Sequence, residues 1–304
     1  MTTPQAIITH GGKFHADDVF AVAALKLIYP NATVYRCKAV KDWPKVVSPI
    51  IVDTGLEHNP SNLTYDHHQR GGAGMHVRTQ VQKASFGLVW DAYGAHILKA
   101  VGSLDSVAML HKIEDTLVSS IDAVDTGTFP TVVFGPDPEN QIPMFGLSST
   151  ISMFNTDDVN HASAQDAAFQ EATQLATRVL KAVITSANES ETARLMFKSH
   201  YDGVSEVAVF SSHIPGWGSA ARDYPNLKFV VFPRDEKFWT GLNVSGEKAS
   251  DAPRARFLQE FGGLSPEDLK KVSGVADAHF CHIAGFMAVA ESKEGVLALI
   301  KKSL

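Results

Sequence analysis

The chain has 304 residues, of which 44% are hydrophobic, and its formal net charge is -6. This length allows a sizeable core and favours two domains, while the acidic balance argues against a broad basic surface for long duplexes. Cys37 and Cys281 lie far apart, which argues against a disulfide framework and a structural zinc finger. The sequence shows no leader-like start and no apolar run near the ~18 residues of a membrane span. We therefore expect a globular cytoplasmic protein without a membrane partner.

Short apolar runs bounded by turn residues predict strands in the first third of the chain. They cover 6–10, 33–37, 49–55 and 63–68. Apolar side chains at helical spacing, with acidic residues in the first turn, predict a helix over 17–29 between the first two strands. Such alternation is typical of a mainly parallel sheet with helices on both faces. Segment 135–146, rich in Pro, Gly and Asp, is predicted to be a loop, and later helices are predicted at about 84–101, 105–121 and 161–187.

A second set of elements follows residue 200 and predicts a smaller α/β domain. Its strands are predicted at 206–212, 228–234, 239–245 and 278–286. Its helices are predicted at 253–261, 266–272 and 294–302. We thus expect an α/β protein in three parts: a catalytic domain over 1–160, a helical connector over 161–200 and a substrate-binding domain over 201–304.

Aspartate and histidine residues follow several of the predicted strands. In open α/β sheets, ligands bind at the carboxyl ends of the strands, so these side chains are expected to share one rim. The candidates are His10, His15, Asp17, Asp18, Asp53, Asp66, His67, His68, Asp122 and Asp125. Imidazole with carboxylate suits Mn²⁺, Fe²⁺, Co²⁺ or Zn²⁺ better than Ca²⁺. The set exceeds what one ion needs and predicts two ions that share a carboxylate.

Six motifs in order resemble the melanocyte proliferating gene 1 family, also labelled metal-dependent protein hydrolases, a branch of the DHH phosphoesterase superfamily. The resemblance covers nearly the whole chain. The motifs are THGGKFHADDVFA, VDTG, YDHHQR, ASFGLVW, IDAVDTG and a C-terminal stretch that begins VSGVADAHFCHIAGF. The resemblance implies a DHH-type domain that holds two divalent ions, with Mn²⁺ foremost.

The resemblance also implies roles for individual residues. His10 and His15 would bind one ion, Asp17 and His67 the other, and Asp53 would bridge them. The fourth motif would supply Asp125, with Asp122 as its rival, whereas Asp18 is interpreted mainly as a charge at a helix N-terminus. Asp66 would orient its neighbours, and His68 would hydrogen-bond a substrate phosphate.

Basic residues outside the metal ligands are candidates for binding substrate phosphates, because arginine matches the geometry of phosphate oxygens. Arg70, beside the histidine pair, is the foremost of these and joins Asp66 and His68 as a predicted catalytic residue. Arg254, Arg256 and His282 are predicted to bind substrate from the second domain.

Three classes of function stay open at this point. The first is an exonuclease that cuts single-stranded RNA or DNA from an end, in the 3′ to 5′ direction, with a hydroxide activated by two metals. The second is a phosphatase or pyrophosphatase for a nucleotide or inorganic pyrophosphate. A metal-binding protein without catalysis is the third, and the label of protein hydrolase adds peptide cleavage. Expected partners are a short single strand or a nucleotide, and a homodimer is left open.

Overall fold

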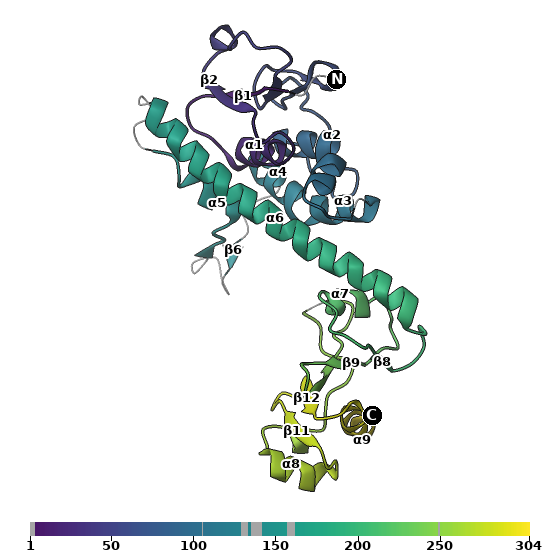
Figure 1. Cartoon of the computed structure of the whole chain (residues 1–304). Coiled ribbons are helices and arrows are strands. Elements are labelled where there is room, and N and C mark those ends of the chain that lie inside the picture. The colour runs from purple at the N-terminus through teal and green to yellow at the C-terminus, as the bar shows by residue number, and fades with distance from the viewer. Residues whose placement is uncertain (1–3, 105, 129–132, 135–141, 157–161, 249) are drawn as a thin grey trace. The chain divides into compact units, whose positions relative to one another are not determined.

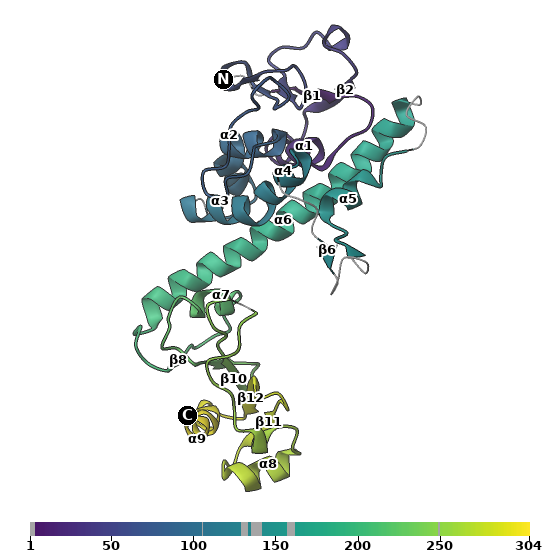
Figure 2. The ribbon, with the colours of Figure 1, turned by 180° about the vertical axis from the view of Figure 1, so that it is seen from behind.

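A computed structural model describes residues 4–104, 106–128, 133–134, 142–156, 162–248 and 250–304. The chain forms two compact units, Met1–Ala187 and Asn188–Leu304. Figures 1 and 2 show their elements from opposite sides. Both units combine helices with a five-stranded sheet, which confirms the predicted mixed α/β class. None of the helices in the described ranges has the length and hydropathy that a bilayer crossing requires.

The sheet of the first unit is mainly parallel, as predicted. In spatial order its strands are β2 (Thr33–Cys37), β1 (Ala6–His10), β3 (Ile50–Val52), β5 (Thr64–Tyr65) and β4 (His58–Asn59). The first four are parallel to one another, and β4 is antiparallel to β5. The first four residues of β1 are buried, so both faces of this interior strand are covered. The detailed DHH-type arrangement, with helices on both faces of the sheet, stays a prediction.

Helix α1 (Ala16–Ile28) connects β1 to β2 and lies in the core of the first unit. Every residue from Ala16 to Leu25 is buried, as expected for a helix that is apolar on nearly all sides. α1 packs against α2 (Ser85–Ala100), where the rings of Phe20 and Phe86 lie 5.5 Å apart. Because core packing surrounds α1, its first turn has a fixed place at the end of β1.

The predicted helix over 105–121 is divided in the structure. α3 (Val107–Ile113) passes into a π-helical segment (Glu114–Val118) and then into α4 (Ser119–Asp125). Apart from α6, the other described elements of this unit are the short helices η1 (Val40–Asp42) and η2 (Pro60–Asn62), the antiparallel strands β6 (Val133–Phe134) and β7 (Ile142–Pro143), and α5 (Leu147–Ser152). Residues 135–141 of the predicted loop lie outside the described residues.

Helix α6 (Ala162–His200) is longer than the predicted helix over 161–187. Its buried side chains up to Ala187 belong to the core of the first unit, whereas Ala193 and Phe197 belong to a core of the second. Apolar side chains at helical spacing therefore continue past the predicted end, and the boundary between the two units falls within this helix.

The second unit also has a five-stranded sheet. In spatial order the strands are β11 (Ala278–Cys281), β12 (Met287–Ala290), β10 (Trp239–Asn243), β9 (Phe229–Pro233) and β8 (Val207–Val209). β8 is parallel to β9, and the other neighbours are antiparallel. The helical segments are α7 (Trp217–Ala221), η5 (Gln259–Phe261), α8 (Pro266–Ser273) and α9 (Lys293–Ser303). The predicted helices over 266–272 and 294–302 are confirmed.

The prediction of a helix over 253–261 is wrong apart from the short turn η5. Pro253 forms an isolated bridge with Ser245, and the N–H of Phe257 donates to the carbonyl of Gly285 at 2.9 Å. Phe257 and Phe261 are both buried, four residues apart, which imitates a helical pattern. Backbone pairing with neighbouring segments outweighs that local pattern.

Candidate metal centre

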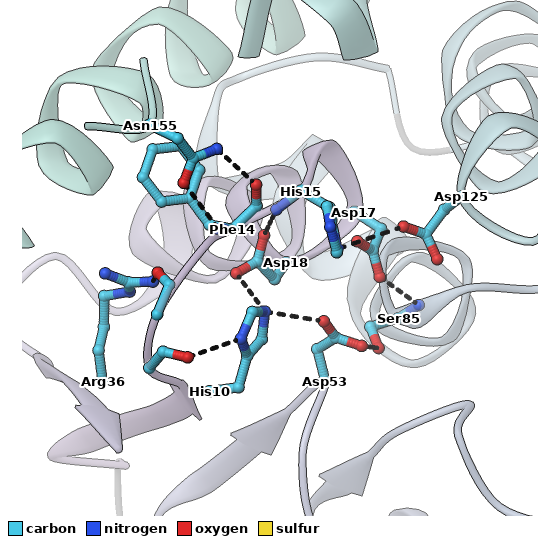
Figure 3. Close-up of polar contacts among 12 residues, drawn as sticks. His10, Phe14, His15, Asp17, Asp18, Arg36, Asp53, Ser85, Asp125 and Asn155 are labelled. Atoms are coloured by element: carbon cyan, nitrogen blue, oxygen red, sulfur yellow. Dashed lines mark hydrogen bonds and ion pairs between the residues drawn. The ribbon is translucent and has the colours of Figure 1, made fainter. Parts of the chain in front are cut away.

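Polar side chains gather where the strands of the first sheet end (Figure 3). His10 is the last residue of β1, Asp53 directly follows β3, and His67 comes two residues after β5. Because these three strands are parallel neighbours, their carboxyl ends meet at one edge of the sheet. α1 begins at the same edge with Asp17 and Asp18 in its first turn. The topology of the sheet therefore assembles side chains from separate motifs.

Asp53 lies between two histidines. Its Oδ2 is 3.3 Å from Nε2 of His10, and its Oδ1 is 3.3 Å from Nε2 of His67. Ser85 Oγ donates a hydrogen bond to the same Oδ1 at 2.9 Å. The backbone φ of Asp53 is 53°, in the left-handed region that aspartate adopts more readily than most residues. Oδ2 thus faces His10, whereas Oδ1 faces His67 and also lies 3.4 Å from Nδ1 of His68. This arrangement suits a carboxylate shared by two ions.

Three groups of side chains each bring their potential ligand atoms within 4.8 Å of one another. They are His10 with Asp18 and Asp53, Asp53 with His67 and His68, and His15 with Asp17 and Asp125. Asp53 belongs to two groups, and all six predicted metal ligands are included. Asp18 joins them, although its sequence context indicated mainly a helix N-terminal charge. The division of these ligands between two ions stays a prediction.

Several buried atoms of these three groups, which together we call the cluster, lie close to one another without forming hydrogen bonds. Nε2 of His10, Nε2 of His67, Oδ1 of Asp17 and Oδ2 of Asp18 have no hydrogen-bond partner within the part of the chain that the structure describes. Nε2 of His10 is nevertheless only 3.1 Å from Oδ2 of Asp18. Buried polar atoms normally have a partner, so this convergence indicates ligands for a cation. The nitrogen and carboxylate donors fit Mn²⁺, Fe²⁺, Co²⁺ or Zn²⁺.

The carboxylates strongly affect the two inner histidines. Burial favours the neutral ring of His10, but the neighbouring Asp18 and Asp53 outweigh burial and raise its pKa to about 10. Burial of His67 is likewise outweighed by Asp125 and Asp53, and the pKa of this ring also rises to about 10. Without cations, protons on the imidazoles therefore balance part of the buried negative charge.

The adjacent histidines His67 and His68 have different environments. Only 12% of the His67 side chain is exposed, whereas 53% of the His68 side chain is exposed. Oδ1 of Asp66 accepts from the backbone N–H of His68 at 3.1 Å and lies 2.8 Å from Nδ1 of its ring. Oδ2 of Asp66 accepts from the N–H of Leu56 at 2.6 Å. His68 is therefore held through Nδ1, and Nε2 has no hydrogen-bond partner among the residues that the structure describes.

The structure separates the two rival aspartates of the fourth motif. Oδ2 of Asp125 is 3.2 Å from Nε2 of His67, and its Oδ1 is 3.9 Å from Nδ1 of His15. Asp122 is fully buried, and its Oδ2 lies 2.7 Å from Nε2 of His76. The arrangement thus brings Asp125 into the cluster and places Asp122 in a different set of contacts.

The predicted basic residues are distributed over both units. Arg70 is exposed in the loop that carries the histidine pair. In the second unit, Arg254 donates to three backbone carbonyls, which engages much of its guanidinium within the fold. Arg256 donates to the carbonyl of Ala284 at 2.6 Å, and Nδ1 of His282 accepts from the N–H of Ala284 at 3.1 Å. Their predicted contacts with substrate stay predictions.

Two distant side chains hold the loop between β1 and α1, and sequence reasoning missed both. Asn155 accepts from the N–H of Phe14 at 3.0 Å and donates to its carbonyl at 2.9 Å (Figure 3). Arg36 donates to the carbonyl of Gly12 at 2.6 Å and forms an ion pair with Asp166 at 3.0 Å. No local pattern signals these contacts, because Asn155 is 141 residues from Phe14.

Fold and site together define a mixed α/β protein with a His/Asp centre suited to divalent cations. The family model MYG1_exonuc, described as uncharacterised protein family UPF0160, matches residues 6–304. The chain belongs to this family, which confirms the resemblance seen in its motifs.

Full-length relatives agree with this assignment. A MYG1 protein of Saccharomyces cerevisiae is 27% identical over 330 residues, which cover 99% of this chain and 96% of the yeast protein. A Mus musculus protein named MYG1 exonuclease is 26% identical over 333 residues, which cover 100% of this chain and 86% of the mouse protein. An uncharacterised Helicobacter pylori protein of known structure is 9% identical, with coverage of 94% and 93%, and its TM-score of 0.29 is too low to define a shared fold.

Replacement of Asp53→Asn should remove most binding of divalent ions, because an amide oxygen lacks the charge that a shared carboxylate supplies. Elemental analysis after dialysis against Mn²⁺ should find about two ions per wild-type chain and far fewer in the variant. Asp91→Asn, which removes a carboxylate paired with Lys83, is the control and should retain its ions. Full occupancy of the Asp53→Asn protein would contradict a shared carboxylate.

Binding of Mn²⁺ should release protons and should strengthen as pH rises. The raised pKa values mean that His10 and His67 carry protons at neutral pH, whereas a metal ligand must be the neutral ring. Calorimetric titrations near pH 7.5 in buffers with different ionisation enthalpies measure this release. Identical heats in all buffers would show that these histidines do not lose protons to the ion.

Proposed function

We propose that the protein is a metal-dependent phosphoesterase that removes nucleotides from an end of single-stranded RNA or DNA. The position of Asp53 between His10 and His67 is the observation that carries this proposal, because shared carboxylates characterise two-metal phosphoesterase sites. The nuclease class is supported by the relatives named MYG1 exonuclease in Mus musculus and Rattus norvegicus. Two Mn²⁺ ions and a 3′ to 5′ direction complete the proposal.

Residues of the cluster would share the work of holding the ions. His10, Asp18 and Asp53 would hold one ion, while Asp17, His67 and Asp125 would hold the other. His15, predicted from the sequence to share an ion with His10, lies with Asp17 and Asp125 and would join the second ion. When bound, the ions would lower the pKa of a water molecule and neutralise charge on the phosphoryl oxygens.

His68 is proposed to bind the phosphate that is cut. Its Nδ1 faces Asp66, while Nε2 is free to donate to a phosphate oxygen when the ring carries both protons. The buried Asp66 carboxylate would stabilise that cationic ring and fix its orientation.

Contacts with the rest of the strand are proposed to be few. A chain with a net charge of -6 can neutralise few phosphates away from its ions. Arg70, Arg254, Arg256 and His282 are the proposed contacts, and the backbone carbonyls that Arg254 binds would hold its guanidinium in place. Such a protein suits a short flexible strand better than a long duplex.

His68→Ala should retain bound Mn²⁺ but lose about 10²-fold or more in turnover, because the ring is proposed to act on the transition state. His67→Ala should lose bound ion as well as activity, because its Nε2 faces the ligand carboxylates. Ion content and turnover measured on the same preparations separate the two roles. Equal ion loss in both variants would contradict them.

The proposed reaction is tested with a 5′-labelled single strand and a covalently closed circle of the same sequence, each with Mn²⁺. The linear strand should give a ladder that shortens from the 3′ end, and the circle should stay intact. Rapid cutting of the circle would indicate an endonuclease. If neither is cut while pyrophosphate or a mononucleotide releases phosphate, the protein acts on small phosphates.

A further inference from the structure

A second cluster of ionisable side chains lies apart from the proposed metal ligands. His76 is fully buried, and both of its ring nitrogens face carboxylates. Nδ1 lies 2.7 Å from Oε1 of Glu114, and Nε2 lies 2.7 Å from Oδ2 of Asp122. When both carboxylates are ionised, each ring nitrogen donates an N–H to one of them, which is the cationic form of the ring. We call these three residues the His76 triad.

The triad packs directly on the first turn of α2. Oδ1 of Asp122 accepts from the N–H of Gly87 at 3.2 Å. A Cβ atom on Gly87 would lie 2.0 Å from Oδ2 of Asp122 and 2.8 Å from Nε2 of His76, so only glycine fits there without displacing them. Asp122 thus satisfies a free N–H of α2, whose own N-cap residue forms no side-chain bond.

The same turn of α2 contacts the metal centre two residues earlier. The N–H of Ser85 donates to Oδ2 of Asp17 at 3.3 Å, and its Oγ donates to Oδ1 of Asp53 at 2.9 Å. A helical turn is rigid, so a displacement of Gly87 by the triad would also displace Ser85. Two proposed ligands therefore depend on where the triad holds this turn.

The triad also anchors the segment that carries Asp125. Asp122 and Asp125 belong to the same short helix α4, and Thr126 donates to the carbonyl of Asp122 through its N–H at 2.9 Å and its Oγ1 at 2.8 Å. Glu114 begins the π-helical segment that leads into α4. Such π-helical turns often occur near functional sites, where they redirect side chains.

We propose that His76, Glu114 and Asp122 are positioning residues that set the affinity of the metal centre for divalent ions, through Ser85 on one side and Asp125 on the other. The inference rests on the metal-binding part of the proposed function and is independent of the substrate. Supporting groups of this kind typically change metal affinity by about 10- to 100-fold when they are removed.

Two glycines of α2 provide a matched test. Gly87→Ala places a methyl group against the triad, whereas Gly94→Ala places one 2.8 Å from Cδ2 of Leu110 and 3.2 Å from the Trp90 ring, among apolar atoms. Both variants should melt at a lower temperature without metal. Calorimetric titration with Mn²⁺ should find at least a roughly 10-fold weaker Kd for Gly87→Ala alone.

A second pair keeps the test decisive if Gly87→Ala does not fold. Glu114→Gln removes one negative charge from the triad but retains an acceptor, and Asp115→Asn removes one from the next residue, which pairs with Arg78 at the surface. Only Glu114→Gln should weaken Mn²⁺ binding, with its melting temperature near that of Asp115→Asn.

These measurements distinguish a failure of the proposed function from a failure of the positioning role. Wild-type protein that binds no divalent ion would overturn the proposed function itself. If the wild-type protein binds Mn²⁺ and a folded Gly87→Ala or Glu114→Gln variant binds it with an unchanged Kd, the positioning role alone is overturned. Equal weakening in Gly87→Ala and Gly94→Ala would also overturn it, because the effect would then follow from loss of packing.

Discussion

The burial of several carboxylates side by side is the constraint on which the first unit depends. Asp17 and Asp18 are fully buried and Asp53 is 3% exposed, so their mutual repulsion and the loss of hydration disfavour the folded state. The fold offsets this with His10 and His67 and with the N-terminus of α2, whose first N–H donates to Asp17. A bound cation would offset it further.

Asp66 shows how one carboxylate can support two loops. It holds the ring and backbone of His68, and it accepts from the N–H of Leu56. Leu56 has a φ of 56° and Asp53 a φ of 53°, so the turn after β3 includes two residues in a conformation unusual outside glycine. The carboxylate of Asp66 therefore stabilises a strained turn as well as the histidine beside it.

The sequence predicts correctly those structural features that a short stretch of residues determines. The βαβ unit at the start follows from apolar spacing, and the convergence of His10, Asp53 and His67 follows from the ends of parallel strands. It could not decide between Asp122 and Asp125, because helical phase alone does not show which of them a distant histidine meets. The helix expected over 253–261 was wrong because Phe257 and Phe261 enter the core from a segment that pairs with its neighbours. The contacts of Asn155 and Arg36 depend on tertiary packing that carries no local signal.

The contacts of Asn155 and Arg36 with the loop between β1 and α1 have a consequence for the order in which the parts of the site become available during synthesis. The loop between β1 and α1 precedes the histidine pair in the chain, but it is held by Asn155 and by Arg36, whose guanidinium in turn contacts Asp166. Asn155 and Asp166 are synthesised only after roughly a hundred further residues have followed the histidine pair, which takes about 5 to 20 seconds at ordinary rates of translation. The nascent chain thus carries the histidines and aspartates of the centre before it carries two of the side chains that hold the loop between β1 and α1 in place.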